Sequence, residues 1–139
     1  MVEFTVQGEP KGKGRPRFGN GRAYTPKTTS EYEKIVLSAY RDKYHTSKLK
    51  GEIWVQIRAY MGIPKSVPKK RRADMIGQGV IKRPDVDNIA KIILDALNGV
   101  AYDDDAQITR LIIAKKYAEV PRVEVKMGEI VNGRLRHDQ

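Results

Sequence analysis

Residues 83–99 read RPDVDNIAKIILDALNG. After Asp87 the apolar residues recur every three or four positions, the spacing of one face of an α-helix. These residues are Ile89, Ile92, Ile93, Ala96, Leu97 and Val100. Asn98 and Gly99 form a helix stop signal, because glycine adopts the left-handed conformation at little steric cost. The stretch therefore predicts an amphipathic helix over about 87–100, with Asp85 and Asp87 at its start.

Alternating apolar and polar residues on either side of this helix predict strands. The predicted strands are 2–7, 52–61, 107–117 and 122–131. The four residues 118–121 suit a hairpin between the last two. Ser30 and Glu33 have the spacing of a capping box and precede a helical pattern that ends near Tyr44. We therefore expect one α/β domain over 1–139, of order β-α-β-α-β-β, with a mixed sheet packed against two helices and a flexible tail at 133–139.

The composition excludes several kinds of chemistry. The chain has 139 residues, enough for one core, and 40% hydrophobic with 32% charged residues is typical of a globular protein. It has no Cys and two His, which excludes disulfides, thiolate zinc sites and Cys nucleophiles and disfavours a His-based site. No apolar run approaches the roughly 20 residues of a membrane helix, and the N-terminus reads as a strand rather than a signal peptide. We expect a cytoplasmic protein with no membrane partner.

The net charge of +10 is unevenly distributed. Residues 1–83 contain 19 Lys and Arg against 7 Asp and Glu, whereas residues 84–139 contain 8 against 10. The basic residues gather with Gly and Pro in 8–27 and 64–72, which favours contact with a nucleic-acid backbone over a merely solvated surface. Phe18 and Tyr24 could stack on exposed bases. The predicted DNA-binding residues are Lys11, Lys13, Arg15, Arg17, Arg22, Lys69, Lys70, Arg71, Arg72, Lys82 and Arg83.

Six of the nine Asp residues lie between positions 85 and 105. Clustered carboxylates repel each other and a phosphate backbone, unless they hold a divalent cation that then meets the phosphate. The alternative is structural: Asp85 and Asp87 only cap the helix. A helix over 88–99 spans roughly 18 Å. We therefore expect residues 103–105 to return to the acidic pair through a strand that runs antiparallel to the helix.

Lys91 lies one helical turn after Asp87, on the same face. It forms either a surface ion pair with Asp87 or a cation beside the metal site that binds the scissile phosphate.

Two motifs carry a family resemblance. The run Asp-x-Asp-Asn-x-x-Lys over 85–91 and the later Asp-Asp-Ala-Gln over 104–107 resemble the RusA family of Holliday-junction resolvases, small endonucleases of bacteria, phages and prophages. The resemblance implies that Asp85, Asp87 and Asp105 are metal-binding catalytic acids, that Asp104 is an acidic neighbour at the metal, and that Lys91 is a catalytic lysine. Which of the residues 103–105 binds metal depends on the alignment of Ala106 and Gln107.

The resemblance further implies an α/β homodimer that cuts four-way DNA junctions by paired symmetric nicks in recombination and repair. Its ion would be Mg²⁺, with Mn²⁺ as a substitute. Two other classes remain open. One is a non-catalytic, basic nucleic-acid-binding module. The other is a nucleotidyl or phosphoryl transferase, for which the sequence lacks a phosphate-binding glycine motif of the right spacing.

Overall fold

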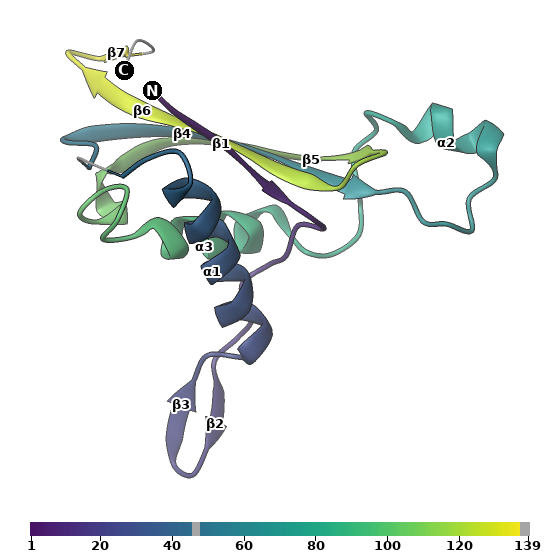
Figure 1. Cartoon of the computed structure of the whole chain (residues 1–139), viewed down its shortest axis with the longest axis horizontal. Coiled ribbons are helices and arrows are strands. Elements are labelled where there is room, and N and C mark those ends of the chain that lie inside the picture. Colours follow the sequence, from purple (N-terminus) through teal and green to yellow (C-terminus); the bar gives the residue numbers. More distant parts are fainter. Residues whose placement is uncertain (46–47, 137–139) are drawn as a thin grey trace.

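The computed structural model describes residues 1–45 and 48–136. Its main sheet contains β1 (Val2–Gln7), β4 (Glu52–Gly62), β5 (Ile108–Ala118) and β6 (Arg122–Val131), in the order β1-β6-β4-β5. β4 is parallel to β5 and antiparallel to β6. Helices α1 (Lys27–Arg41) and α3 (Val86–Leu97) lie on one face of this sheet (Figure 1). The predicted α/β class, the mixed sheet and the order of the main elements are confirmed.

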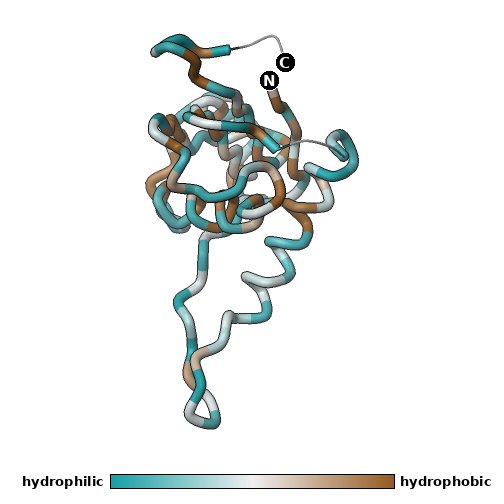
Figure 2. The backbone as a smooth tube through the Cα atoms, turned by 90° about the vertical axis from the view of Figure 1, so that its left-hand side faces the viewer, coloured by the Kyte–Doolittle hydropathy of each residue, from teal (hydrophilic) through white to brown (hydrophobic). Residues whose placement is uncertain are grey.

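The core lies between the sheet and the two helices. Alternate residues of β1 are buried, and α3 buries the apolar stripe that its sequence predicts. In β4, the side chains of Ile53, Val55 and Ile57 are at most 1% exposed. Figure 2 shows the hydrophobic segments gathered in the body of the molecule, away from its projecting end. The periodicity of β1, β4 and α3 therefore correctly predicted which face each of them buries.

The prediction of a hairpin between the last two strands is wrong. β5 and β6 are both paired with β4, one on each side, and do not pair with each other. Alternation fixes the face that a strand buries but carries no information about its neighbours. β4 lies between β6 and β5, and β5 becomes an edge strand.

The capping-box prediction for α1 is also wrong. The helix begins at Lys27, three residues before Ser30, and its N-cap residue Pro26 makes no side-chain cap. The hydroxyl of Ser30 instead donates to the carbonyl oxygen of Pro26, at 3.4 Å. Glu33 is bound by Lys13, in a contact described below. The helix also ends earlier than predicted, at Arg41.

Several short elements were not predicted. The basic loop 8–27 contains a hairpin of β2 (Arg17–Gly19) and β3 (Arg22–Tyr24), which projects away from the body (Figure 1). The second basic segment continues into a short helix, α2 (Lys69–Met75).

Two further short elements lie at the end of the α3–β5 connection and near the C-terminus. A 3₁₀ turn, η1 (Asp105–Gln107), precedes β5. In the tail predicted to be flexible, β7 (Arg134–Leu135) pairs with β6, and residues 137–139 of that tail lie outside the described residues. No helix in the described part of the chain is both long enough and apolar enough to cross a membrane.

Candidate functional site

Asp85 and Asp87 lie at the N-terminal end of α3. Asp85 is the N-cap residue and Asp87 lies in the first turn, and both side chains are exposed. Asp85 occupies the capping position, but its carboxylate makes no capping hydrogen bond. The Asp85 side chain therefore does not close the first turn, and both carboxylates are open to solvent at a position where the helix dipole favours negative charge.

The start of the basic loop is held against this end of α3. The backbone N–H of Lys13 donates to the carbonyl oxygen of Asn88, at 2.9 Å. Asp85 and Asn88 line a shallow pocket together with the loop and with the segment before α3. The other lining residues are Pro10, Lys11, Gly12, Lys13, Arg83 and Pro84. The structure thus brings Lys11 and Arg83, two predicted DNA-binding residues, to the same pocket as Asp85.

We expect Gly12→Ala to reduce catalytic activity by about 10-fold or more, because small misplacements of groups around a site are costly. A Cβ at position 12 would lie 2.8 Å from the Cβ of Pro84 and 3.1 Å from the Cβ of Asn88, so the loop must move away from the site. Turnover of a DNA substrate at saturation measures this effect. Gly19→Ala is the control, because the nearest atom there belongs to the Tyr24 ring, which can move. Equal activity of the two variants would show that the loop position is unimportant.

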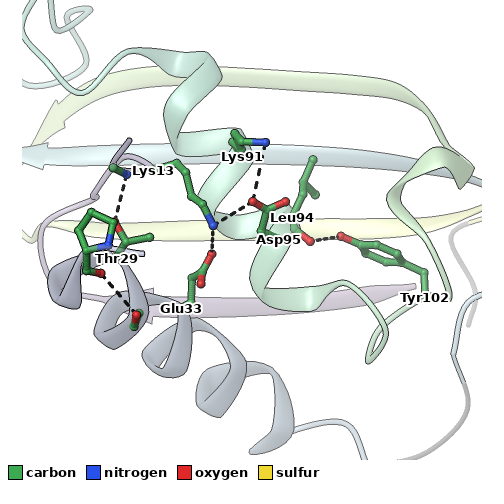
Figure 3. Close-up of polar contacts among 10 residues, drawn as sticks. Lys13, Thr29, Glu33, Lys91, Leu94, Asp95 and Tyr102 are labelled. Atoms are coloured by element: carbon green, nitrogen blue, oxygen red, sulfur yellow. Dashed lines mark hydrogen bonds and ion pairs between the residues drawn. The ribbon is translucent and has the colours of Figure 1, made fainter. Parts of the chain in front are cut away.

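Lys13 has a structural role that its predicted DNA contact did not include. Its ammonium lies 2.7 Å from Glu33 Oε2 of α1 and 3.0 Å from Asp95 Oδ2 of α3, with 20% of its side chain exposed (Figure 3). Burial alone would lower the pKa of Lys13, but the hydrogen bonds and charges of the two carboxylates raise it above its ordinary value. The two ion pairs make Lys13 a link between the loop and both helices, and its DNA contact stays a prediction.

Lys13→Met should destabilise the fold by about 1–2 kcal/mol, since two charge-assisted hydrogen bonds are lost from a mostly covered position. Because the pKa of Lys13 is raised in the folded state, its contribution is complete below pH 10.5 and is lost only as the pH rises through the folded-state pKa. Urea unfolding at pH 7 and at pH 9 should therefore give the same difference from the unsubstituted protein. The exposed Lys11→Met is the control and should unfold like the unsubstituted protein.

Lys91 is accessible at the same helix face. Its side chain is 62% exposed, and its ammonium lies 3.9 Å from Asp95 Oδ2, a weak ion pair (Figure 3). The ion-pair partner of Lys91 is therefore Asp95, four residues later, and not Asp87, four residues earlier, as the sequence analysis considered. A side chain held this loosely can turn toward a phosphate near the acidic pair.

Lys115 is a site residue that the sequence did not reveal. From β5, its ammonium donates to the carbonyl oxygens of Lys82, at 2.8 Å, and Pro84, at 3.0 Å. It thereby holds the segment that leads into Asp85. Its partners are backbone atoms some thirty positions away in the chain, so no sequence pattern could have indicated this contact.

The second acidic group follows α3, and its three carboxylates differ in their partners. Asp103 pairs with Lys48 at 2.9 Å, and this hydrogen bond and the charges of Lys48 and Lys50 hold the pKa of Asp103 below its ordinary value. Asp104 caps η1 through a capping box with Gln107. Asp105 has no side-chain partner among residues 1–45 and 48–136. Asp105 is therefore the carboxylate of this group that is free to bind a ligand.

The predicted meeting of the two acidic groups does not occur within one chain. α3 runs from Asp85 toward the turn that holds 103–105, and β5 then runs back, so that Lys115 near its end lies beside Pro84 (Figure 1). The far end of β5 therefore returns to the N-terminal end of α3, whereas Asp105 lies just before the start of β5 and remains at the C-terminal end of the helix. In the described part of the chain, no three acidic or histidine side chains are grouped closely enough to hold a metal ion.

Most of the remaining predicted DNA-binding residues lie on the β2–β3 hairpin and on α2. Arg17 and Arg22 are exposed on the β2–β3 hairpin, where Phe18 is 81% exposed. Asn20 and Gly21, both with positive φ, form its turn, and this Asn-Gly pair is the signal that should have predicted the hairpin. The other exposed predicted cations are Arg15 at the base of the hairpin, Lys82 before α3, and Lys69, Lys70 and Arg71 on α2. Arg72 is partly buried and donates to the carbonyl oxygen of Pro64, and its DNA contact stays a prediction.

The structure combines an α/β fold with exposed carboxylates near basic segments, a surface on which a polyanion could bind. Comparison with known proteins specifies the class. The family model for the endodeoxyribonuclease RusA matches residues 7–128. The chain belongs to the RusA endodeoxyribonuclease family. It is also 35% identical, over 93% of its length and 96% of the relative's, to YqaN, an uncharacterized protein of Bacillus subtilis strain 168.

Proposed function

We propose that the protein is a divalent-metal-dependent endonuclease that resolves four-way DNA junctions by paired nicks, in recombination and repair. The observation that supports this most directly is the pocket that Asp85, whose carboxylate makes no capping hydrogen bond, lines together with the basic residues Lys11 and Arg83. A binding module would have no need of exposed carboxylates beside basic residues, because they repel phosphate. Membership in an endodeoxyribonuclease family supports the nuclease reading.

The proposed roles follow from position. The two basic projections would hold the DNA backbone, one at the hairpin and one at α2. Lys91 would contact the scissile phosphate and offset the charge that develops there. Lys115 and the start of the basic loop, which is hydrogen-bonded to Asn88, would keep Asp85 and Asp87 in place for the reaction. We place this activity in the bacterial cytoplasm, for a host or for a phage.

The donor atoms suit a hard divalent ion, because Mg²⁺ and Mn²⁺ are bound by carboxylate oxygens. When bound, such an ion would lower the pKa of a water molecule and stabilise charge on the phosphate. The predicted ligands, Asp85, Asp87, Asp104 and Asp105, are nevertheless divided between the two ends of α3. Among residues 1–45 and 48–136, one chain therefore supplies suitable donors without grouping three of them at one place.

The test is cleavage of a synthetic four-way junction by the full-length protein, with Mg²⁺ or with EDTA, against a linear duplex of the same sequence. We expect paired, symmetric nicks in the junction that are lost with EDTA. Tight junction binding without cleavage under any divalent ion would contradict the proposal and indicate a non-catalytic binding module. Equal cutting of the linear duplex would support nuclease activity but contradict selectivity for junctions.

A further inference from the structure

The face of the main sheet opposite α1 and α3 carries a pocket that the proposed nuclease function does not use. Side chains alternate between the two faces of a strand, and the residues of β4 that alternate with Trp54 and Gln56 are buried in the core. Trp54 and Gln56 therefore point to the opposite face, which α1 and α3 leave uncovered (Figure 1). In β5, Arg110 lies opposite Trp54 and Ile112 lies opposite Gln56. These four residues line one pocket, which we call the sheet pocket.

The sheet pocket is small and has apolar walls. Its volume is about 280 Å³, and its apolar side chains include Met1, Trp54, Ile112 and Leu135. Ile112 is 59% exposed, although it is a large apolar residue in the middle of a strand. Pockets that enclose a small organic molecule usually measure about 300–1,000 Å³. The sheet pocket therefore has room for one or two side chains rather than for a cofactor.

The indole of Trp54 is itself almost covered. Its neighbour in β6 is Gly128, and a Cβ at that position would lie 2.8 Å from Trp54 Nε1 and 3.1 Å from Trp54 Cε2. The indole thus occupies the space that a side chain at position 128 would take, and Trp54 is only 6% exposed. Nucleic acid is recognised on such faces by stacking of bases on accessible rings, for which Trp54 offers little surface.

Two cations flank the apolar walls of the sheet pocket. Arg110 is exposed on β5, and Lys126 is half-buried on β6. Glu3 stands opposite Lys126 in β1 but forms no ion pair with it. In the described part of the chain, neither Arg110 nor Lys126 forms an ion pair with any carboxylate. The surroundings of the pocket therefore complement a ligand that carries acidic groups.

We propose that the sheet pocket docks a short acidic peptide segment of another protein, with an apolar side chain in the pocket and carboxylates beside Arg110 and Lys126. A DNA backbone would bring phosphates but no side chain to cover Ile112. A second copy of this chain, packed through the same face under two-fold symmetry, would bring the same cations against Arg110 and Lys126, and like charges repel. Because the pocket lies on the face opposite α3, a docked segment leaves the proposed nuclease site accessible.

Trp54 is the single Trp of the chain, so its fluorescence reports directly on the sheet pocket. The probe is the synthetic peptide Asp-Asp-Leu-Phe-Asp-Asp, added to the full-length protein without DNA or divalent ions. We expect a saturable change in Trp54 emission. A matched peptide with Ala in place of Leu and Phe should bind at least about 10-fold more weakly, because it buries less apolar surface. The measurement involves no cleavage and is therefore independent of the proposed nuclease function.

Substitutions of exposed residues locate the binding. Ile112→Asp and Arg110→Glu should each weaken binding of the first peptide at least about 10-fold, through repulsion of its carboxylates and loss of an apolar wall or of a cation. Arg58→Glu is the matched control, because Arg58 is an exposed cation on the same face of β4 but outside the sheet pocket. At physiological salt it should change binding by less than about 3-fold. Thermal unfolding verifies that all three variants are folded.

Four outcomes would overturn the proposal. The first is the absence of a saturable change in Trp54 emission with the folded protein. The second is an equal loss of binding in Arg58→Glu and Arg110→Glu, which would indicate attraction to a generally basic face. The third is displacement of the peptide by a short DNA duplex that changes Trp54 emission in the same way, which would make nucleic acid the occupant. The fourth is a change in Trp54 emission on dilution of the protein alone, together with a decrease in its sedimentation mass, which would make a second copy the occupant.

Discussion

Asp105→Asn should reduce junction cleavage by at least about 100-fold, while Asp103→Asn leaves it within about 2-fold. The two residues lie two positions apart in the same acidic group, but the structure gives them different partners. Asp103 is neutralised by Lys48 on the surface, whereas Asp105 has no side-chain partner in the described regions of the chain. The variants are compared by single-turnover cleavage of a four-way junction.

Asn keeps the size of the Asp side chain but removes its charge, so a loss of activity reports the carboxylate rather than the packing. Junction binding, measured without divalent ions, should be retained or slightly strengthened by Asp105→Asn, because a negative charge is removed. Asp87→Asn should behave like Asp105→Asn. Full activity of Asp105→Asn, with a loss in Asp103→Asn instead, would move the free ligand to position 103 and contradict the assignment.

Removing the polar and aromatic tip of the hairpin should weaken junction binding by about 100-fold. The variant combines Arg17→Ala, Phe18→Ala and Arg22→Ala. Stacking of one base on an aromatic ring contributes about 1–3 kcal/mol, and each lost phosphate contact lowers the salt dependence of binding by about one ion. Binding titrations at several salt concentrations therefore test both the stacking and the phosphate contacts. We expect the slope of the logarithm of the binding constant against the logarithm of the salt concentration to decrease by about two.

The control replaces three similarly exposed residues of α1, through Lys34→Ala, Ile35→Ala and Arg41→Ala. It removes the same number of cations and one exposed apolar side chain from a helix away from the hairpin tip (Figure 1). Thermal unfolding of the hairpin variant should be nearly unchanged, since its three side chains are exposed and outside the core. An unchanged salt slope in that variant would show that the hairpin does not contact DNA.

The elements that were predictable from the sequence are those in which local pattern determines structure. The stripe in α3 and the alternation in β1 and β4 identified helix, strands and buried faces, because burial of a periodic apolar face stabilises each element separately. The hairpin of β2 and β3 was also encoded, in Asn20 and Gly21, and was missed. The start of α1 was mispredicted. The helix begins at Lys27, so Ser30 lies inside it, and Glu33 binds Lys13 rather than completing a capping box.

The sequence by itself determined the class of the fold, the buried faces and the residue types of the site. Only the tertiary structure decided that β4 separates β5 from β6, that Lys13 and Lys115 hold the segments around Asp85, and that Asp85 and Asp105 lie at opposite ends of α3. The physical reason is that periodicity reports how a segment meets the core, which is a local property. Which strands are neighbours, and which charges meet, depends on packing between segments far apart in the chain.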